Sequence, residues 1–274
     1  MNTFKTSKLS QALLLTLCLI LCFSLSACGG SSSSSGGEAK AEKYVVATEP
    51  TYPPFETTEE DGTLVGFDID LMEAIAEDQG FEVEWASLAF DALIPSLGAG
   101  NSDIVIAGIS STPERAKNAD FSDGYFFGGS AVMVMADSEL NSMDDVNADT
   151  TFATQIGTVM ADVLLKMQED GECGDVTQLD VFSTCVMQMQ NGDVMAVAAD
   201  AITIDAYMAE KDGFKKIGNL PSLNDDPYNR IAVKKGNAEL LDKINAGLAH
   251  LIENGKYAEI CKKYELAADN YEKK

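Results

Sequence analysis

Histidine, arginine and tryptophan are the scarcest chemically distinctive residues of this sequence. Its 274 residues include one histidine, His250, one tryptophan, and two arginines, Arg115 and Arg230. His250 lies in a predicted helix over 238–253, and the sequence has neither a CxxC motif nor a Cys/His cluster. A Walker loop and a G-x-G-x-x-G motif are also missing. These absences argue against a metal site, a histidine-based triad and a phosphate-binding loop, so we expect no metal and no cofactor.

Positive charge is the next shortage. The chain carries 44 acidic residues against 19 basic ones, and its formal net charge is −25. A protein of this charge repels nucleic acid and anionic lipid headgroups, so we expect neither as a direct partner. Most of the acidic residues are expected to form a solvated surface. The length after residue 43 suffices for two modest domains, each with its own core.

The N-terminal residues have the layout of a secretory signal. Two lysines precede an apolar stretch over 12–25, which is shorter than the roughly 20 residues that a membrane-spanning helix needs. The residues Leu-Ser-Ala-Cys that end at Cys28 look like a bacterial lipobox. We therefore predict a lipoprotein signal peptide over 1–27, a lipid on Cys28, and a Ser/Gly tether over 28–43. The alternative is an ordinary signal peptide with a coincidental cysteine. Either way the body is expected outside the cytoplasm, and the lipid would hold it at the outer face of the plasma membrane or in the periplasm.

Three cysteines remain in the body once the signal peptide and Cys28 are set aside: Cys173, Cys185 and Cys261. Their odd number prevents complete pairing within one chain. A Cys173–Cys185 disulfide and two free buried thiols both fit the sequence.

Strands and helices alternate along the body. The predicted strands cover 44–48, 81–85, 103–107, 132–135, 152–154, 176–181, 194–198 and 231–234. The predicted helices cover 67–79, 90–97, 159–168, 184–190, 238–253 and 257–265. Asp68 is predicted to cap the first helix and Gly80 to end it. The alternation indicates α/β layers with largely parallel sheets, in which ligands bind beyond the carboxyl ends of the strands.

Arg115 follows one of these strands and stands out because the chain otherwise uses lysine for its positive charge. A guanidinium group is a planar fork that grips a carboxylate through two parallel hydrogen bonds, which an ammonium group does not do. Arg115 is therefore a candidate carboxylate clamp. The alternative is a surface arginine in a polar turn.

A set of motifs spread in order from Tyr44 to Tyr264 resembles the family 3 solute-binding proteins, the polar amino acid receptors of ABC importers. The motifs are Thr48-Glu-Pro-Thr-Tyr-Pro-Pro-Phe-Glu56, Gly66-Phe-Asp-Ile-Asp-Leu71, Phe90-Asp-Ala-Leu-Ile-Pro-Ser-Leu97, Ile109-Ser-Ser-Thr-Pro-Glu-Arg115, Asp120-Phe-Ser-Asp123, Gln155-Ile-Gly-Thr158, Asn191-Gly-Asp-Val194 and Gly255-Lys-Tyr257. The resemblance implies a type II periplasmic-binding-protein-like fold with two α/β lobes, each a mainly parallel sheet flanked by helices. It places lobe 1 at 44–127 plus 230–274, lobe 2 at 132–222, and two hinge segments at about 128–131 and 223–229.

The resemblance also implies a site for an amino-acid zwitterion. The expected ligand-binding residues are Glu49, Tyr52, Phe90, Gly108, Ser110, Arg115, Thr158, Val159 and Asp200. Arg115 would bind the α-carboxylate together with Ser110, Thr158 and the Val159 amide, at the positive end of a helix. Asp200 and the Gly108 carbonyl would accept the α-ammonium group.

The two aromatic residues, Tyr52 and Phe90, would sandwich the ligand side chain, an arrangement that also favours a cation. Core packing is the alternative for both rings, and a helix N-cap is the alternative for Asp200.

Two positions depart from the commoner family pattern near the hinge: Gly124 stands where a proline is usual and is expected to loosen a turn, and 227–232 has one extra residue.

Glu49 is expected where the ligand side chain ends. An acid there pairs with a lysine, arginine or histidine side chain, and it equally accepts hydrogen bonds from a glutamine amide. The resemblance thus implies a monomeric, non-enzymatic receptor that delivers glutamine or a cationic amino acid to a membrane permease. Two other functions stay open: an enzyme on the same scaffold, similar to a cyclohexadienyl dehydratase with Glu49 or Asp200 as its acid, and a lipoprotein adhesin without a small ligand.

Overall fold

The structure is a computed structural model that describes residues 41–222 and 226–273. The predicted signal peptide, the lipidation site Cys28 and most of the tether lie outside the described residues. Residues 41–274 form one compact unit. Within its described part, no helix has both the length and the apolar character needed to cross a bilayer.

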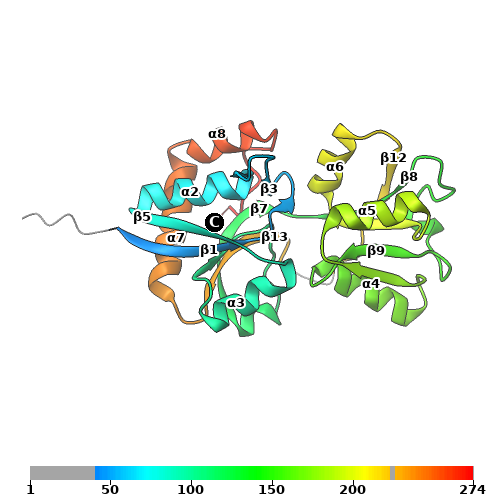
Figure 1. The fold of residues 1–274 in the computed structure, drawn as a ribbon, viewed down its shortest axis with the longest axis horizontal. Coiled ribbons are helices and arrows are strands. Elements are labelled where there is room, and N and C mark those ends of the chain that lie inside the picture. Colours follow the sequence, from blue (N-terminus) through cyan, green and yellow to red (C-terminus); the bar gives the residue numbers. More distant parts are fainter. Residues whose placement is uncertain (1–40, 223–225, 274) are drawn as a thin grey trace, which may run out of the picture. The chain divides into compact units, whose positions relative to one another are not determined.

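The first lobe is built on a five-stranded sheet with the strand order β5-β1-β6-β13-β7. Its strands are β1 (Glu42–Thr48), β5 (Phe81–Ser87), β6 (Ile104–Val105), β7 (Ala119–Phe127) and β13 (Tyr228–Lys234). Its helices are α2 (Phe67–Gln79), α3 (Leu93–Ala99), α7 (Ala238–Glu253) and α8 (Lys256–Lys263), with the short 3-10 helices η1 (Phe90–Ala92) and η2 (Arg115–Lys117). Side chains alternate along β1, so Val46 packs in the cluster that contains α2 and α7, and Ala47 packs with α3. Helices therefore cover both faces of the sheet (Figure 1).

The second lobe repeats this plan with the strand order β10-β9-β11-β8-β12. Its strands are β8 (Ser130–Met135), β9 (Phe152–Gln155), β10 (Val176–Leu179), β11 (Ala196–Asp200) and β12 (Phe214–Gly218). Its helices are α4 (Val159–Asp170), α5 (Phe182–Asn191) and α6 (Ala201–Glu210), with the 3-10 helix η3 (Met143–Asp145). Val132 faces the cluster of α4 and its neighbour Met133 faces that of α5, so this sheet is also covered on both sides.

Each sheet is mainly parallel, as predicted, with one strand that runs in the opposite direction. In lobe 1, β5, β1 and β6 run parallel, whereas β13 is antiparallel to both β6 and β7. In lobe 2, β10, β9 and β11 run parallel, and β8 is antiparallel to β11 and β12. The strands that directly follow a crossing between the lobes, β8 and β13, run against the parallel set. The predicted α/β architecture is confirmed, and the parallel strands of each lobe supply the strand ends that carry the site.

A small sheet of three short strands, β2 (Thr51–Tyr52), β3 (Glu56–Thr58) and β4 (Leu64–Val65), lies between β1 and α2. Gly66 precedes α2 with φ 144°, and a Cβ atom there would come within 2.1 Å of the Phe55 carbonyl oxygen. This close approach lets the amides of Phe67 and Asp68 bond to the 54–55 backbone. The predicted helix is confirmed, as is its end at Gly80, but Gly66 occupies the N-cap position. Asp68 is therefore not the cap, and its side chain is fully buried.

The three body cysteines are free and buried, so the possible Cys173–Cys185 disulfide is not formed. Cys185 lies on α5 and packs in the cluster on one face of the second sheet, whereas Cys173 packs in the cluster on the opposite face. A disulfide needs Cα atoms within about 7 Å, which two residues separated by a sheet do not satisfy.

The strands β7 and β12, the helix α6 and the three-stranded sheet were not predicted from the sequence. Gly124, expected in a loosened turn, instead lies within β7, where a Cβ atom would come within 2.5 Å of the Tyr228 Cβ. The absence of a side chain there makes room for Tyr228 on the neighbouring strand. β13 begins at Tyr228, two residues before the predicted return to lobe 1.

Candidate functional site

A cavity lies where the strand ends of the two lobes meet. It is lined by Tyr52, Phe90, Gly108, Ser110, Arg115, Gln155, Thr158, Val159, Met160 and Asp200. Eight of the nine predicted ligand-binding residues line it, and Glu49 does not. A wider cleft beside the crossing segments shares Ser110, Val159, Met160 and Asp200 with this cavity.

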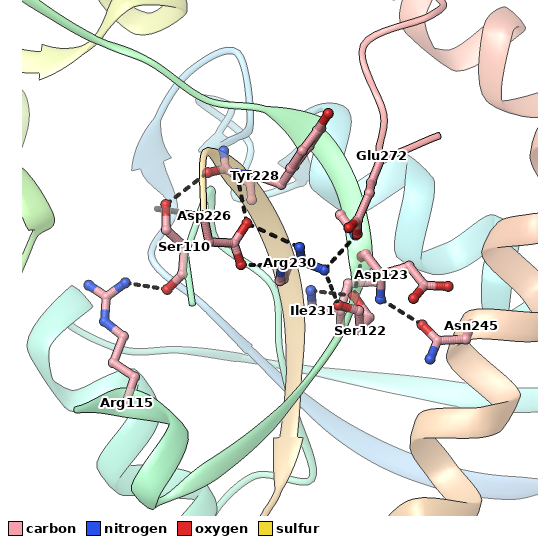
Figure 2. Close-up of polar contacts among 12 residues, drawn as sticks. Ser110, Arg115, Ser122, Asp123, Asp226, Tyr228, Arg230, Ile231, Asn245 and Glu272 are labelled. Atoms are coloured by element: carbon pink, nitrogen blue, oxygen red, sulfur yellow. Dashed lines mark hydrogen bonds and ion pairs between the residues drawn. The ribbon is translucent and has the colours of Figure 1, made fainter. Parts of the chain in front are cut away.

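Arg115, on η2, reaches across to lobe 2. Its Nη1 donates to the Ser110 carbonyl at 2.6 Å and its Nη2 to the Gly157 carbonyl at 2.8 Å. Figure 2 shows the guanidinium group directed at Ser110. The guanidinium carbon lies 5.5 Å from the centre of the Phe90 ring. Burial lowers the pKa of Arg115 to about 10, so the side chain is still cationic at neutral pH. Two of its five N–H groups are used, and the others are available to a carboxylate.

The start of α4 forms the facing wall. Thr158 is its N-cap: the hydroxyl accepts from the Ala161 amide at 3.2 Å and donates to the Gln155 carbonyl at 2.7 Å. The hydroxyl is thus engaged in capping, and the contribution of this wall to an anion is the helix dipole with its first amides. Gly157 has φ +76°, and a Cβ atom there would stand 3.0 Å from the Asp91 Cβ. The missing side chain permits the close approach of η1.

Asp200 ends β11 at the N-cap position of α6, yet its side chain makes no capping hydrogen bond. Its Oδ2 instead accepts from the Tyr52 hydroxyl at 2.8 Å, and its backbone amide donates to the same hydroxyl at 2.9 Å. Burial raises the pKa of Asp200 to about 6. The carboxylate therefore faces the cavity rather than its own helix, as an ammonium acceptor must.

The two aromatic residues differ in their surroundings. Tyr52 is 5% exposed and packs against Phe55, with ring centres 6.3 Å apart, and edge-on against Phe182 at 6.0 Å. Tyr52 therefore belongs to the core and lines the cavity at the same time. Phe90 is less buried and carries the Arg115 guanidinium on its face. Their pairing around a ligand side chain stays a prediction.

Gly108 and Ser110 follow β6 and bound the cavity from lobe 1. The Gly108 amide donates to Asp68 Oδ2 at 2.7 Å, which fixes the backbone at φ +54°. Ser110 uses its carbonyl for Arg115, and its backbone pairs with that of Asn229 on β13. The strand end that positions Arg115 is thus joined to the strand that returns from lobe 2.

Glu49 lies behind the cavity wall. It is 3% exposed, and its carboxylate accepts hydrogen bonds from the Thr51 hydroxyl and, at 3.2 Å, from Gln155 Nε2. Gln155 Nε2 also donates to the Asp180 carbonyl at 2.8 Å. Burial raises the pKa of Glu49. Gln155 also lines the cavity with a polar side chain, but it was not among the predicted ligand-binding residues. It is the last residue of β9, so the rule that ligands bind beyond the ends of parallel strands could have identified it.

Arg230, the second arginine, has a structural role (Figure 2). It binds Asp226 through two hydrogen bonds, from Nε at 2.6 Å and Nη2 at 3.0 Å. Its Nη1 donates to Glu272 at 2.9 Å and to the Ser122 carbonyl at 2.8 Å. Three segments therefore converge on one guanidinium group: the return crossing, β7 and the C-terminal tail.

Residues 44–267 match the bacterial extracellular solute-binding proteins, family 3. The chain is 30% identical to the arginine-binding extracellular protein ArtP of Bacillus subtilis (strain 168), an alignment that covers 92% of this chain and 96% of ArtP. A solved ancestral arginine-binding protein bound to arginine is 38% identical, with a TM-score of 0.74, and covers 81% of this chain and 97% of its own. An ancestral amino acid-binding protein, a precursor of cyclohexadienyl dehydratase, is 29% identical with a TM-score of 0.72, over 81% of this chain and 95% of its own.

Proposed function

This chain belongs to the bacterial extracellular solute-binding proteins, family 3, and we propose that it captures a cationic L-amino acid, with arginine the first to test, and delivers it to a membrane permease. Its place among extracytoplasmic amino-acid-binding proteins of ABC transporters follows from the family and from its relatives. The choice of ligand, the delivery step and a lipid anchor at Cys28 are the parts proposed here.

The state of Glu49 supports a cationic ligand. Its carboxyl group is buried and receives two hydrogen bonds from neutral groups, the Thr51 hydroxyl and the Gln155 amide. A buried carboxylate is most stable when a cation is paired with it. A guanidinium or ammonium group that displaces the Gln155 amide, or lies beside it, would supply that charge. ArtP, whose name records arginine binding, supports the same choice.

Glutamine is the second candidate ligand. Because burial raises the pKa of Glu49, the side chain also suits a neutral amide partner. Gln155 lines the cavity and offers a further amide.

The zwitterion would bind through groups that both lobes supply. Arg115 and the first amides of α4 would hold the α-carboxylate, and Asp200 with the Gly108 carbonyl would hold the α-ammonium group. Contacts that exist only when the lobes are together shift the population toward the closed form. A closed, loaded protein would then present both lobes to the permease, and a lipid tether would keep it close to the membrane.

A thermal-shift screen tests this proposal. Residues 38–274 would be mixed with each of the twenty amino acids, ornithine, citrulline and cystine. A ligand at 100 times its dissociation constant adds about 2.7 kcal/mol to the free energy of unfolding. We expect arginine to raise the melting temperature and Arg115→Ala to abolish that rise. A rise with glutamine alone would select the second ligand.

An absence of any shift would overturn the receptor proposal. The dehydratase alternative would then be tested by release of product from a cyclic prephenate-like acid, since a precursor of such an enzyme is among the structures that the chain resembles. If that assay is also negative, an adhesin without a small ligand is left.

A further inference from the structure

Two carboxyl groups behind the cavity are fully buried and interact with each other, and three of their four oxygens have no hydrogen-bond donor among the described residues. Glu56, on β3, and Asp68, in the first turn of α2, both have 0% exposure. If both groups are ionised, both carboxyl oxygens of Glu56 and Oδ1 of Asp68 have no hydrogen-bond partner among the described residues. Buried polar atoms without partners are rare in folded proteins, so these three oxygens need an explanation.

The other oxygen of Asp68 is well satisfied. Its Oδ2 accepts from the Gly108 amide at 2.7 Å and from the Tyr125 hydroxyl at 2.7 Å. Two donors on one oxygen stabilise the anionic form of Asp68. Glu56 has no comparable donor. If one proton is shared by the pair, it therefore belongs on Glu56.

We propose that Glu56 is a protonated carboxylic acid that donates to Asp68 Oδ1, and that this pair positions Gly108 beside the ligand. One proton gives a partner to Asp68 Oδ1 and to one Glu56 oxygen together, and it leaves the pair with a single negative charge instead of two. Two adjacent buried carboxylates do not both ionise near neutral pH, because like charges repel in a medium of low polarity.

The surroundings of the pair favour retention of the proton. The titratable groups that interact with it are Tyr125 on β7, Tyr257 on α8, Glu49 behind the cavity wall, and Asp200 at the cavity. None of the four is a cation, so none offsets a second negative charge on the pair. Burial, and the neighbouring acid in the case of Glu56, raise the pKa of both carboxyl groups.

The pair acts on the ligand through Gly108, and this step rests on the proposed function. Asp68 fixes the Gly108 amide, which sets the orientation of the next peptide group and of the Gly108 carbonyl at the cavity. That carbonyl is the proposed partner of the α-ammonium group. Glu56 touches no ligand in this scheme, so it is a positioning residue that works through Asp68.

Infrared spectroscopy tests the proton directly. At neutral pH the wild-type protein should show the carbonyl band of a protonated carboxylic acid, and Glu56→Gln should lack it. Glu49→Gln is the matched control, because Glu49 is also a buried glutamate but its oxygens already receive two hydrogen bonds. Asp200→Asn controls for the other raised carboxyl group. A band that is absent from the wild type, or unchanged in Glu56→Gln, would overturn the proposal.

If Glu56→Gln does not fold, carbon-13 NMR of wild-type protein labelled at glutamate carboxyl groups decides the same point. One glutamate should keep the chemical shift of an acid at neutral pH, and a set in which every glutamate is ionised would contradict the pair.

The unfolding equilibrium gives an independent readout. The folded protein holds a proton that free glutamate releases above about pH 4.5, so the wild type loses stability relative to Glu56→Gln as the pH rises. The ratio of the two unfolding constants should grow by up to tenfold per pH unit until the pair loses its proton. Equal pH slopes would overturn the proposal.

Arginine titrations at the same pH values test the positioning role. Affinity of the wild type should weaken once the pair loses its proton, by up to tenfold per pH unit, relative to the affinity of Glu56→Gln over the same range. Parallel profiles would remove the link to Gly108 and leave only the shared proton. If no amino acid binds either protein, the proposed function fails, while the infrared, NMR and unfolding results still decide the pair.

Discussion

Tyr52 and Asp200 are joined by two hydrogen bonds through a single phenol oxygen. The hydroxyl donates to the Asp200 carboxylate at 2.8 Å and accepts from the Asp200 backbone amide at 2.9 Å. Tyr52 belongs to the small sheet of lobe 1, and Asp200 ends a strand of lobe 2. The same contact therefore closes the two lobes and orients the acid that we assign to the ligand.

Replacing Tyr52 with Phe removes both hydrogen bonds but keeps the ring. Because each such bond contributes about 0.5–1.5 kcal/mol, we expect arginine binding to weaken by about 1–3 kcal/mol, as measured by calorimetry. Tyr207→Phe is the control, since the Tyr207 ring packs against Phe182 and Phe214 away from the cavity. An unchanged affinity in Tyr52→Phe would show that this contact does not contribute to closure.

Arginine binding should depend on pH through Asp200. Burial raises its pKa to about 6, and only its ionised form accepts an ammonium group. We expect affinity to fall by up to tenfold per pH unit below about pH 6 in the wild type. Asp200→Asn should bind weakly with no such slope.

The raised pKa of Asp200 has the opposite effect on the stability of the fold: stability falls as the pH rises. Since the folded pKa lies above the unfolded one, the folded protein binds more protons between about pH 4 and 6, and the free energy of unfolding falls as the pH rises through that window. Urea unfolding of the wild type and Asp200→Asn across this range would measure the difference.

Arg115→Lys tests the shape of the clamp apart from its charge. A lysine keeps the positive charge but loses the fork that bonds to Ser110, Gly157 and a carboxylate together. We expect Arg115→Ala to cost about 2–5 kcal/mol of binding free energy and Arg115→Lys to recover only part of it. Lys117→Ala, in the same exposed turn, should bind normally in the same calorimetric assay. Full recovery by lysine would mean that charge alone suffices.

Glu49→Gln distinguishes the two candidate ligands. If the ligand is cationic, loss of the carboxylate should cost about 1.5–3 kcal/mol for arginine and little for glutamine. Glu114→Gln, at an exposed glutamate, is the matched control. Competition binding with both amino acids measures the ratio, and an unchanged arginine affinity would remove the cationic ligand from the proposal.

Two glycines with positive φ should respond differently to alanine. Gly66→Ala puts a methyl group within 2.1 Å of the Phe55 carbonyl, whereas Gly62→Ala meets nothing within 4 Å. We expect Gly62→Ala to cost about 1 kcal/mol of unfolding free energy from backbone conformation alone. Gly66→Ala should cost well over that, because the small sheet has to separate from α2. Chemical denaturation compares them, and similar costs would show that α2 shifts easily.

The helices of this fold were predictable where their signals are local. The helix over 238–253 was predicted with its observed ends, since apolar residues recur at helical spacing and Asn237 caps it. The helix predicted over 90–97 splits into η1 and α3, and Pro95 fits in the first turn of α3 because no intrahelical donor is needed there.

β7 was not predictable in the same way. Its first half reads as a polar turn with a glycine, and it is a strand because it pairs with β13, more than a hundred residues later in the chain. Propensity carries no information about such a partner.

The site was predictable as a location more than as a set of contacts. Strand ends and helix starts bring Arg115, Thr158 and Asp200 to one cavity. Which atoms are already engaged depends on side-chain partners: the Thr158 hydroxyl caps a helix, and Gln155 stands between Glu49 and the cavity. No local pattern encodes those pairings.

The C-terminal tail matters to anyone who would turn this protein into a biosensor. The Asn270 carbonyl accepts from the Phe127 amide, and Glu272 binds both Gly124 and Arg230, so the tail is attached where the chain passes between the lobes. A fluorescent reporter fused within a few residues of Glu272 would pull on this junction and alter the signal that it is meant to read. A long, uncharged spacer between Lys274 and the reporter would disturb these contacts less.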